Sequence, residues 1–334
     1  MSEVTPSIKP TSENDWTIHS INIHGIFFER LCQKSIFDHV QWKLKSTNYP
    51  VEFPPPNGPF RGKESSLDIR AELKKSDRVF TLLIECKKNN PELVNWIFFP
   101  KYFKPETSSV GLYQMTNKAR SDSPGHWSTD TSLKTLNARH IQIPVADEAR
   151  ETRGSYLGYK GGSITKTSSS AIQEAAHQVG LATMSIFKED EEFSNVLGKT
   201  NPPQPMPWSK QILLPTIITS AHLFTCTFDP ADVNAGTGEI PYGKAKLTEV
   251  THLFYEYPLP RHLQSKPRDL VQALSGNHIE DFMRMHIMVV HSGALRGVLD
   301  VLAGEEDIFF AYFEVPERGK RCQVSFRDAR HPTI

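Results

Sequence analysis

Two carboxylates and one amine lie close together in the sequence and could support metal-assisted hydrolysis. Asp68 stands between two aliphatic residues, and a single residue separates Glu85 from Lys87. A hard cation such as Mg²⁺ prefers carboxylate and water oxygens and usually takes only one or two protein carboxylates as ligands. A neighbouring ammonium group can orient an attacking water or balance the charge of a transition state. These three residues therefore predict a site for phosphodiester hydrolysis that uses Mg²⁺, with Mn²⁺ as a possible substitute.

A β-hairpin is expected to bring the three residues together. Apolar and polar residues alternate from 67 to 73, and a β-rich run from 79 to 87 follows a polar turn. If the turn is centred between residues 76 and 77, Asp68 lies directly opposite Glu85, and Lys87 lies about 7 Å farther along the same face. Two opposed carboxylates repel each other, so the register predicts a cation between them.

The same register divides the hairpin into an apolar face and a charged face. The apolar face would hold Leu67, Ile69, Ala71, Leu73, Phe80, Leu82, Ile84 and Cys86, and the charged face Asp68, Arg70, Glu72, Thr81, Glu85 and Lys87. The charged face also has an interpretation without chemistry, as a solvent-exposed surface whose acids pair with Arg70 and Lys88. The hairpin pattern alone leaves both interpretations open.

The order of elements around the hairpin resembles that of the PD-(D/E)XK superfamily of restriction-endonuclease-like nucleases. A helix with a glutamate precedes the hairpin, and a second helix and a buried strand follow it. Leu67-Asp68 stands where the family's name has Pro-Asp. The resemblance covers residues 20–90 and 168–228, and it implies an α/β fold whose central mixed sheet has the hairpin at its centre and helices on its flanks.

The resemblance also implies which groups bind the metal. Asp68, Glu85 and the main-chain carbonyl of Cys86 would be ligands, and Glu29 on the first helix is the candidate for a further acidic ligand, although a plain surface glutamate explains it as well. Related nucleases often carry a functional glutamine on the second helix, which implies a role for Gln178 or, alternatively, Gln173.

Three basic residues are further candidates for nucleic-acid binding. Arg153, Lys160 and Lys166 lie in a glycine-containing stretch before the second helix. Such a stretch could surround a phosphate backbone. A mobile, solvated loop would have the same composition.

The rest of the chain predicts helices, several buried strands and one irregular region. The expected parts are a flexible leader at 1–18, helices at 21–45 and 168–187, a loop or short edge strand near 48–66, a break at 189–210, strands within 212–228, a strand that turns into a helix over 286–302, and a last strand at 307–316. A single domain is expected over 19–334, with its core at 20–90 and 168–228, an irregular insertion at 90–166 and a C-terminal sheet extension at 229–334.

Composition narrows the class of protein. Lys plus Arg equal Asp plus Glu at 38 each, so overall charge does not indicate a non-specific polyanion binder. The four cysteines form no CxxC pair, which argues against a structural zinc site and favours buried thiols. We find no signal peptide and no apolar run long enough to span a bilayer, so a soluble, cytoplasmic protein is expected.

The sequence therefore predicts an endonuclease that cleaves DNA, in a setting such as restriction or anti-phage defence. An RNA-directed or structure-specific nuclease would use the same site. A non-catalytic module that binds nucleic acid or protein through Trp96 and Trp127 is a third possibility. A homo-oligomer is expected because cutting both strands of a duplex needs two sites, and a partner ATPase or defence subunit would be compatible.

Overall fold

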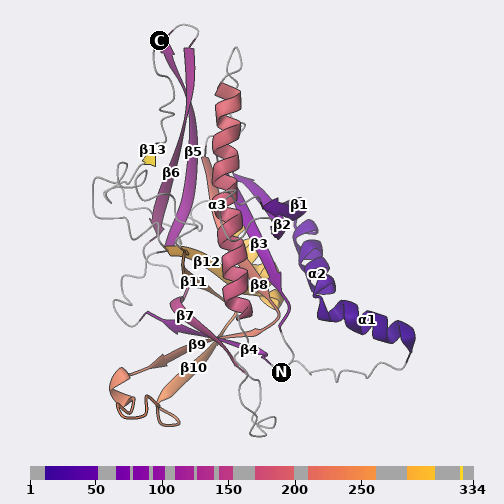
Figure 1. Ribbon diagram of the computed structural model, residues 1–334, viewed down its shortest axis with the longest axis vertical. Helices are drawn as coiled ribbons and strands as arrows, with labels where there is room; N and C mark the ends of the chain where they lie inside the picture. Colours follow the sequence, from indigo (N-terminus) through magenta and orange to yellow (C-terminus); the bar gives the residue numbers. More distant parts are fainter. Residues whose placement is uncertain are drawn as a thin grey trace, which may run out of the picture.

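The chain forms an α/β structure around one large mixed β-sheet (Figure 1). This computed structural model describes residues 12–51, 65–75, 78–89, 93–101, 110–123, 126–138, 143–152, 170–198, 210–260, 284–304 and 324–325. Ten strands follow one another across the sheet in the order β1-β2-β3-β8-β12-β11-β7-β4-β9-β10, and β5, β6 and β13 lie off this path. The α/β class and the mixed sheet were both expected from the sequence.

The first expected helix is in fact two helices followed by a strand. Helix α1 (Glu13–Ile23) begins at a capping box formed by Ser12 and Asp15, within the segment expected to be a flexible leader. Helix α2 (Ile26–Phe37) follows after Gly25, whose φ of 79° no residue of a continuous helix adopts. The prediction of one helix over 21–45 was therefore wrong.

The hairpin of β2 (Ser65–Lys75) and β3 (Arg78–Lys87) has the register predicted from the sequence. Ile69 pairs with Ile84 and Leu73 with Phe80. The two turn residues at 76 and 77 lie outside the described residues. Strand β1 (Lys43–Val51) pairs with β2 and forms one end of the sheet order. It includes the first four residues of the segment expected to be a loop or short edge strand, and residues 52–64 of that segment lie outside the described residues.

The hairpin lies near one end of the sheet order rather than at its centre. On its inner side, β3 runs parallel to β8 (Lys210–Thr219), and β8 runs parallel to β12 (Arg284–His291). Parallel strands that neighbour one another present their carboxyl ends at the same edge of the sheet. The ends of β3, β8 and β12 therefore meet at Lys87, Thr219 and His291, which are aligned across the three strands.

Most of the described residues in the region expected to be an irregular insertion lie in strands. The remaining strands are β4 (Asn95–Pro100), β5 (Val110–Ser123), β6 (His126–Ala138), β7 (Val145–Thr152), β9 (His222–Phe228), β10 (Ala245–Val250), β11 (His252–Pro258) and β13 (Val324–Ser325). Strands β5 and β6 have mostly polar sequences and lack the apolar alternation that reveals a strand, because their partner is each other and the edge of β8. Strands β10, β11 and β12 join the same sheet, as expected of the C-terminal part.

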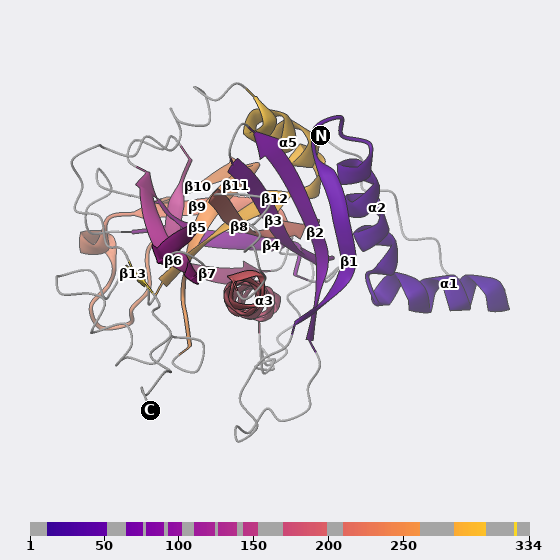
Figure 2. The same cartoon turned by 90° about the horizontal axis from the view of Figure 1, so that it is seen from above.

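Two apolar clusters lie on the two faces of the sheet. The first unites Ile84 with α2 and with α5 (Leu295–Ala303), and the second unites Leu83 with α3 (Ala171–Gly198). Figure 2 shows α3 on one side of β3 and α5 on the other. The helices gather around this half of the sheet and do not flank all of it, contrary to the expected arrangement.

Two details of the packing differ from the sequence analysis. Helix α3 begins where expected but continues past residue 187 to Gly198, because the acidic run that follows is compatible with a helix and the next proline comes only at 202. Leu67 packs in the second cluster, whereas Ile69 packs in the first. The described pairing of β2 with β3 ends at Ile69. Leu67 therefore lies beyond the paired residues and need not share the face of Ile69.

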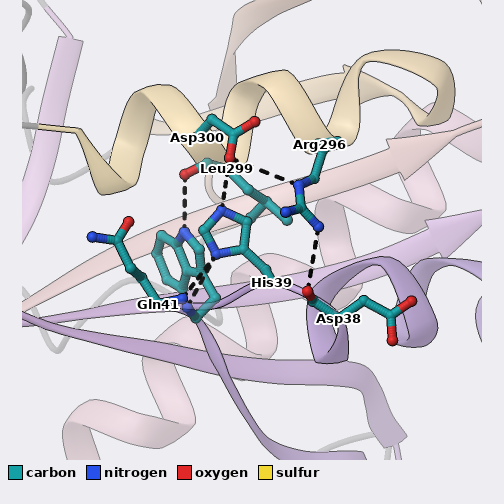
Figure 3. Close-up of polar contacts among 7 residues, drawn as sticks. Asp38, His39, Gln41, Arg296, Leu299 and Asp300 are labelled. Carbon is teal, nitrogen blue, oxygen red and sulfur yellow. Dashed lines mark hydrogen bonds and ion pairs between the residues drawn. The ribbon is translucent and has the colours of Figure 1, made fainter.

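The start of β1 is fastened to α5 by a small polar network (Figure 3). The buried His39 accepts two hydrogen bonds at Nδ1 from the backbone and contacts Asp300 Oδ1 through Nε2 at 3.1 Å. Because Nδ1 accepts, Nε2 carries the proton and donates it to the carboxylate. Trp42 Nε1 also donates to the carbonyl of Leu299 at 3.1 Å. The network fixes the C-terminal end of α2 against the body of the protein.

No helix in the described part of the chain has both the length and the apolar character needed to cross a membrane. Cys32, Cys86 and Cys226 are buried free thiols, as expected, and Cys322 lies outside the described residues.

Candidate functional site

Asp68 lies between the two strands of the hairpin, where their backbone pairing stops. The described ladder ends at Ile69 and Ile84. One residue beyond, Asp68 Oδ2 accepts a hydrogen bond of 2.7 Å from the backbone N–H of Cys86. Within a β-strand, the N–H and C=O of one residue point to the same side. The carbonyl of Cys86 therefore faces the side on which Asp68 lies.

Glu85 is buried, with only 3% of its surface exposed. Its Oε1 forms an ion pair of 2.9 Å with Lys87 Nζ. Its Oε2 is buried and has no hydrogen-bond partner among the described residues. A buried oxygen without a partner is costly, particularly if the group is ionised. This oxygen is thus available to a cation or to a solvent molecule.

The interpretation of the hairpin as a solvent-exposed charge ladder does not fit this geometry. Glu85 is in the interior, and its partner is Lys87. Arg70 instead pairs with Glu72 at 3.1 Å, and Lys88 Nζ donates to the backbone carbonyl of Asn22 at 2.6 Å. The structure thus separates Glu85 and Lys87 from the surface charges of the hairpin.

The surroundings favour the neutral forms of both carboxylic acids. Burial is the main cause that raises the pKa of Asp68 from 3.8 to about 6, although the N–H of Cys86 lowers it and Glu29 raises it further. Burial, followed by the negative charge of Asp68, raises the pKa of Glu85 from 4.5 to about 8, against the opposing effect of Lys87. Two acids with raised pKa values side by side form a site that is short of positive charge.

Glu29 contributes charge to this site from α2. Its carboxylate raises the pKa of both Asp68 and Glu85. Lys88, directly after β3, donates a hydrogen bond to the carbonyl of Asn22 near the end of α1. This bond holds the junction between α1 and α2 beside the end of β3. Among the described residues, however, no three His, Cys, Asp or Glu side chains are grouped to hold a metal ion. Glu29 thus acts here as a nearby charge, and its expected role as a ligand remains a prediction.

The candidate ligands other than Glu29 are two carboxylates and one main-chain carbonyl, and they suit Mg²⁺. Two carboxylates and a main-chain oxygen are hard ligands, and Mg²⁺ commonly takes only one or two carboxylates from the protein and completes its shell with water and phosphate. Asp68 and Glu85 could provide the carboxylates, and Cys86 the carbonyl. The unpartnered Oε2 of Glu85 and the raised pKa values of both acids are properties that a bound cation would relieve.

The residues predicted to contact nucleic acid are only partly described. Arg153, Lys160 and Lys166 lie outside the described residues. Gln178 is half-buried on α3, and its side-chain oxygen is buried without a hydrogen-bond partner among the described residues. The alternative, Gln173, donates to the hydroxyl of Tyr255 at 3.0 Å.

Polar residues that the sequence analysis did not select lie at the same sheet edge as Lys87. The rings of His222 and His291 stack with centroids 6.0 Å apart, and His222 Nδ1 lies 3.5 Å from Glu249 Oε1. His291 and Thr219 end β12 and β8, the strands next to β3. Their position directly after buried strands was visible in the sequence and could have identified them, because ligands of parallel sheets bind at the carboxyl ends of strands.

A cavity of about 430 Å³ lies beneath α5, next to the end of β12, where Phe254, Met288 and Val298 line it. These residues belong to the first apolar cluster, on the opposite side of the sheet from Leu83. Asp68, Glu85 and Lys87 are not among its lining residues. Trp96, which a binding module could have used for stacking, is 1% exposed and part of the second cluster, and the side chain of Trp127 lies outside the described residues.

Comparison of the chain with models of protein families gives no match, and comparisons with curated proteins and with solved structures give none either. The geometry of the hairpin and its surroundings is therefore the basis on which a function can be proposed.

The raised pKa of Glu85 leads to a prediction about stability without metal. Between pH 4.5 and about 8, Glu85 is ionised in the unfolded chain but still protonated in the folded protein. The free energy of unfolding therefore falls as the pH rises through this window. In EDTA at pH 9, Glu85→Gln is expected to be more stable than the wild type, by on the order of 3 kcal/mol. Urea unfolding at pH 5, 7 and 9 measures the difference, which should shrink at pH 5 and in Mg²⁺. A wild type that is equally stable from pH 5 to 9 in EDTA would contradict the burial of this charge.

Proposed function

We propose that this protein is a metal-dependent endonuclease that hydrolyses DNA phosphodiester bonds. The observation that carries the proposal is the buried carboxylate of Glu85, which has one oxygen paired with Lys87 and the other without a partner among the described residues. A glutamate in this state, next to Asp68, is a costly arrangement for a merely structural hairpin. Perturbed acids of this kind cluster at functional sites.

The order of the elements supports a restriction-endonuclease-like core as the framework of the site. Helix α2 with Glu29 precedes the hairpin, and α3 and the buried strand β8 follow it. Strand β8 pairs with the whole of β3 in parallel, from Arg78 to Lys87. This is the sequence of helix, hairpin, helix and buried strand on which the resemblance to the PD-(D/E)XK superfamily rests.

Each residue of the site has a distinct role in the proposed reaction. Asp68 and Glu85 would hold Mg²⁺ together with the carbonyl of Cys86, and the ion when bound would supply Lewis-acid stabilisation of the phosphate charge. Lys87 fixes the orientation of the Glu85 carboxylate through their 2.9 Å contact. It is 22% exposed, so its ammonium group can also reach a solvent molecule or a phosphate oxygen.

The proposal is tested by incubating the purified chain with plasmid DNA, linear DNA and RNA, each in Mg²⁺, Mn²⁺ or EDTA. We expect nicking or cutting of DNA in Mg²⁺ or Mn²⁺ and none in EDTA. Cleavage confined to RNA would favour the RNA-directed alternative, and cleavage that survives EDTA would contradict the metal. No cleavage of any substrate would favour a non-catalytic binding module or a nuclease that a partner protein must activate.

A further inference from the structure

Exposed apolar side chains are concentrated on α1, α2 and the residues just after them. Of the eleven large hydrophobic residues that are exposed in the described part of the chain, seven lie between residues 16 and 40. They are Trp16, Ile18, Ile26, Phe27, Leu31, Phe37 and Val40. Single exposed hydrophobic residues are ordinary, but a group of this size on adjoining elements marks an interaction surface. We call these seven residues the helical apolar surface.

Helix α2 cannot hide this surface by rotating into the core. Its opposite side already packs there through Cys32 and Ile36, which are 1% and 0% exposed. Just after the helix, Arg296 of α5 donates to the carbonyl of Asp38, and His39 contacts Asp300 (Figure 3). The inner side of α2 is therefore fixed, and its outer side remains available to another molecule.

Helix α1 would gain stability from a further packing surface. It has 11 residues and extends away from the sheet (Figures 1 and 2). Helices shorter than roughly 12 residues are marginal in water unless they pack against something. The capping box of Ser12 and Asp15 favours the start of α1 but buries no apolar area. The exposed Trp16 supplies apolar area that such packing would use, whereas Ile18, two residues farther on, lies about 200° around the helix axis from it.

We propose that the helical apolar surface is the interface through which two copies of this chain form a dimer. Its seven side chains expose on the order of 600 Å² of apolar area, close to the roughly 800 Å² per partner of a standard interface. The charges beside them suit a symmetric contact, because the exposed ion pair of Lys34 and Asp38 offers both signs to the same surface of a second copy. The chain as a whole carries no net charge that would keep two copies apart.

The inference does not depend on the proposed nuclease activity, because assembly is measured without any substrate. We expect sedimentation velocity to show a dimer at micromolar concentration. The double variant Leu31→Lys and Phe37→Lys should weaken dimerisation at least about a hundredfold, while its circular dichroism stays that of the wild type. Leu247→Lys is the matched control, since Leu247 on β10 and Leu31 are both 57% exposed, and this variant should remain dimeric.

A second measurement keeps the inference testable if the double variant is poorly folded. Amide hydrogen exchange in α1 should slow when the wild-type concentration rises from well below to well above the dissociation constant, because the partner would stabilise this helix. A monomer at every accessible concentration, a dimer that the α2 substitutions leave intact, or exchange in α1 that is independent of concentration would each overturn the proposal.

Discussion

Replacing Glu85 by glutamine is expected to lower the rate of metal-dependent cleavage by a factor of at least about 10³. Glutamine keeps the size of the side chain and a carbonyl oxygen, but it removes the charge that would hold Mg²⁺. The substitution also removes a group whose ionisation opposes folding, so the loss of activity should occur in a protein that folds at least as well as the wild type. Loss of activity without loss of stability is the expected signature of a functional residue.

Metal binding provides a readout for Glu85 that is independent of cleavage. With a pKa of about 8, Glu85 is mostly protonated at pH 7, so Mg²⁺ binding should release about one proton. Calorimetric titrations in two buffers with different ionisation heats measure this number, which should fall toward zero in Glu85→Gln. Glu72→Gln is the control on the same hairpin, since Glu72 pairs with Lys45 and Arg70 and has no role in the site. If Glu85→Gln bound Mg²⁺ and cleaved DNA like the wild type, the proposed site would be wrong.

The register of the hairpin could be predicted because two independent signals agree on it. The apolar alternation determines which residues share a face, and the length of the turn determines which residues lie opposite each other. Together they predicted that Asp68 lies beside Glu85. The hydrogen bond from the N–H of Cys86 to Asp68 agrees with this register, because Cys86 directly follows Glu85. A local pattern was sufficient because the two strands are adjacent in the sequence.

The burial of the site could not be predicted in the same way. Alternation marks Glu85 as belonging to the face opposite Ile84 but does not say whether that face meets solvent. The second apolar cluster, which contains Leu83 and α3, covers it. Helix α3 begins more than 80 residues after Glu85, and contacts between segments so far apart leave no periodic signal in either one. The raised pKa values, which distinguish this site from a surface ladder, depend on that long-range packing.

The polar β5–β6 hairpin and the turn at Gly25 were missed for different physical reasons. Strands β5 and β6 pair with each other along nearly their whole length through backbone hydrogen bonds, and such bonds do not require an apolar pattern. Gly25 interrupts a run whose apolar residues continue at helical spacing on both sides, so periodicity alone suggests one helix. A lone glycine within a helical pattern is weak evidence of a break until its φ is known.

Replacing Lys87 by alanine is expected to reduce turnover by roughly 10² or more while changing the affinity for DNA by less than about tenfold. The ammonium group contacts Glu85 and is partly exposed, so it can act on the reacting groups as well as on the ligand carboxylate. One secondary effect must be separated from this role. Lys87 lowers the pKa of Glu85, so its removal raises that pKa further and weakens Mg²⁺ binding at neutral pH.

The two effects of Lys87 differ in their response to pH and metal concentration. A rate deficit that arises only from weaker Mg²⁺ binding should disappear at saturating Mg²⁺ and a pH of about 9, because a high metal concentration and a low proton concentration both favour ionised Glu85. A deficit in catalysis itself should persist under those conditions. The neighbouring Lys88→Ala is the control, because Lys88 contacts the Asn22 carbonyl rather than Glu85, and its turnover should stay within about threefold of the wild type. If Lys87→Ala retained full turnover at saturating Mg²⁺, Lys87 would serve only to lower the pKa of Glu85 and would have no part in the reaction.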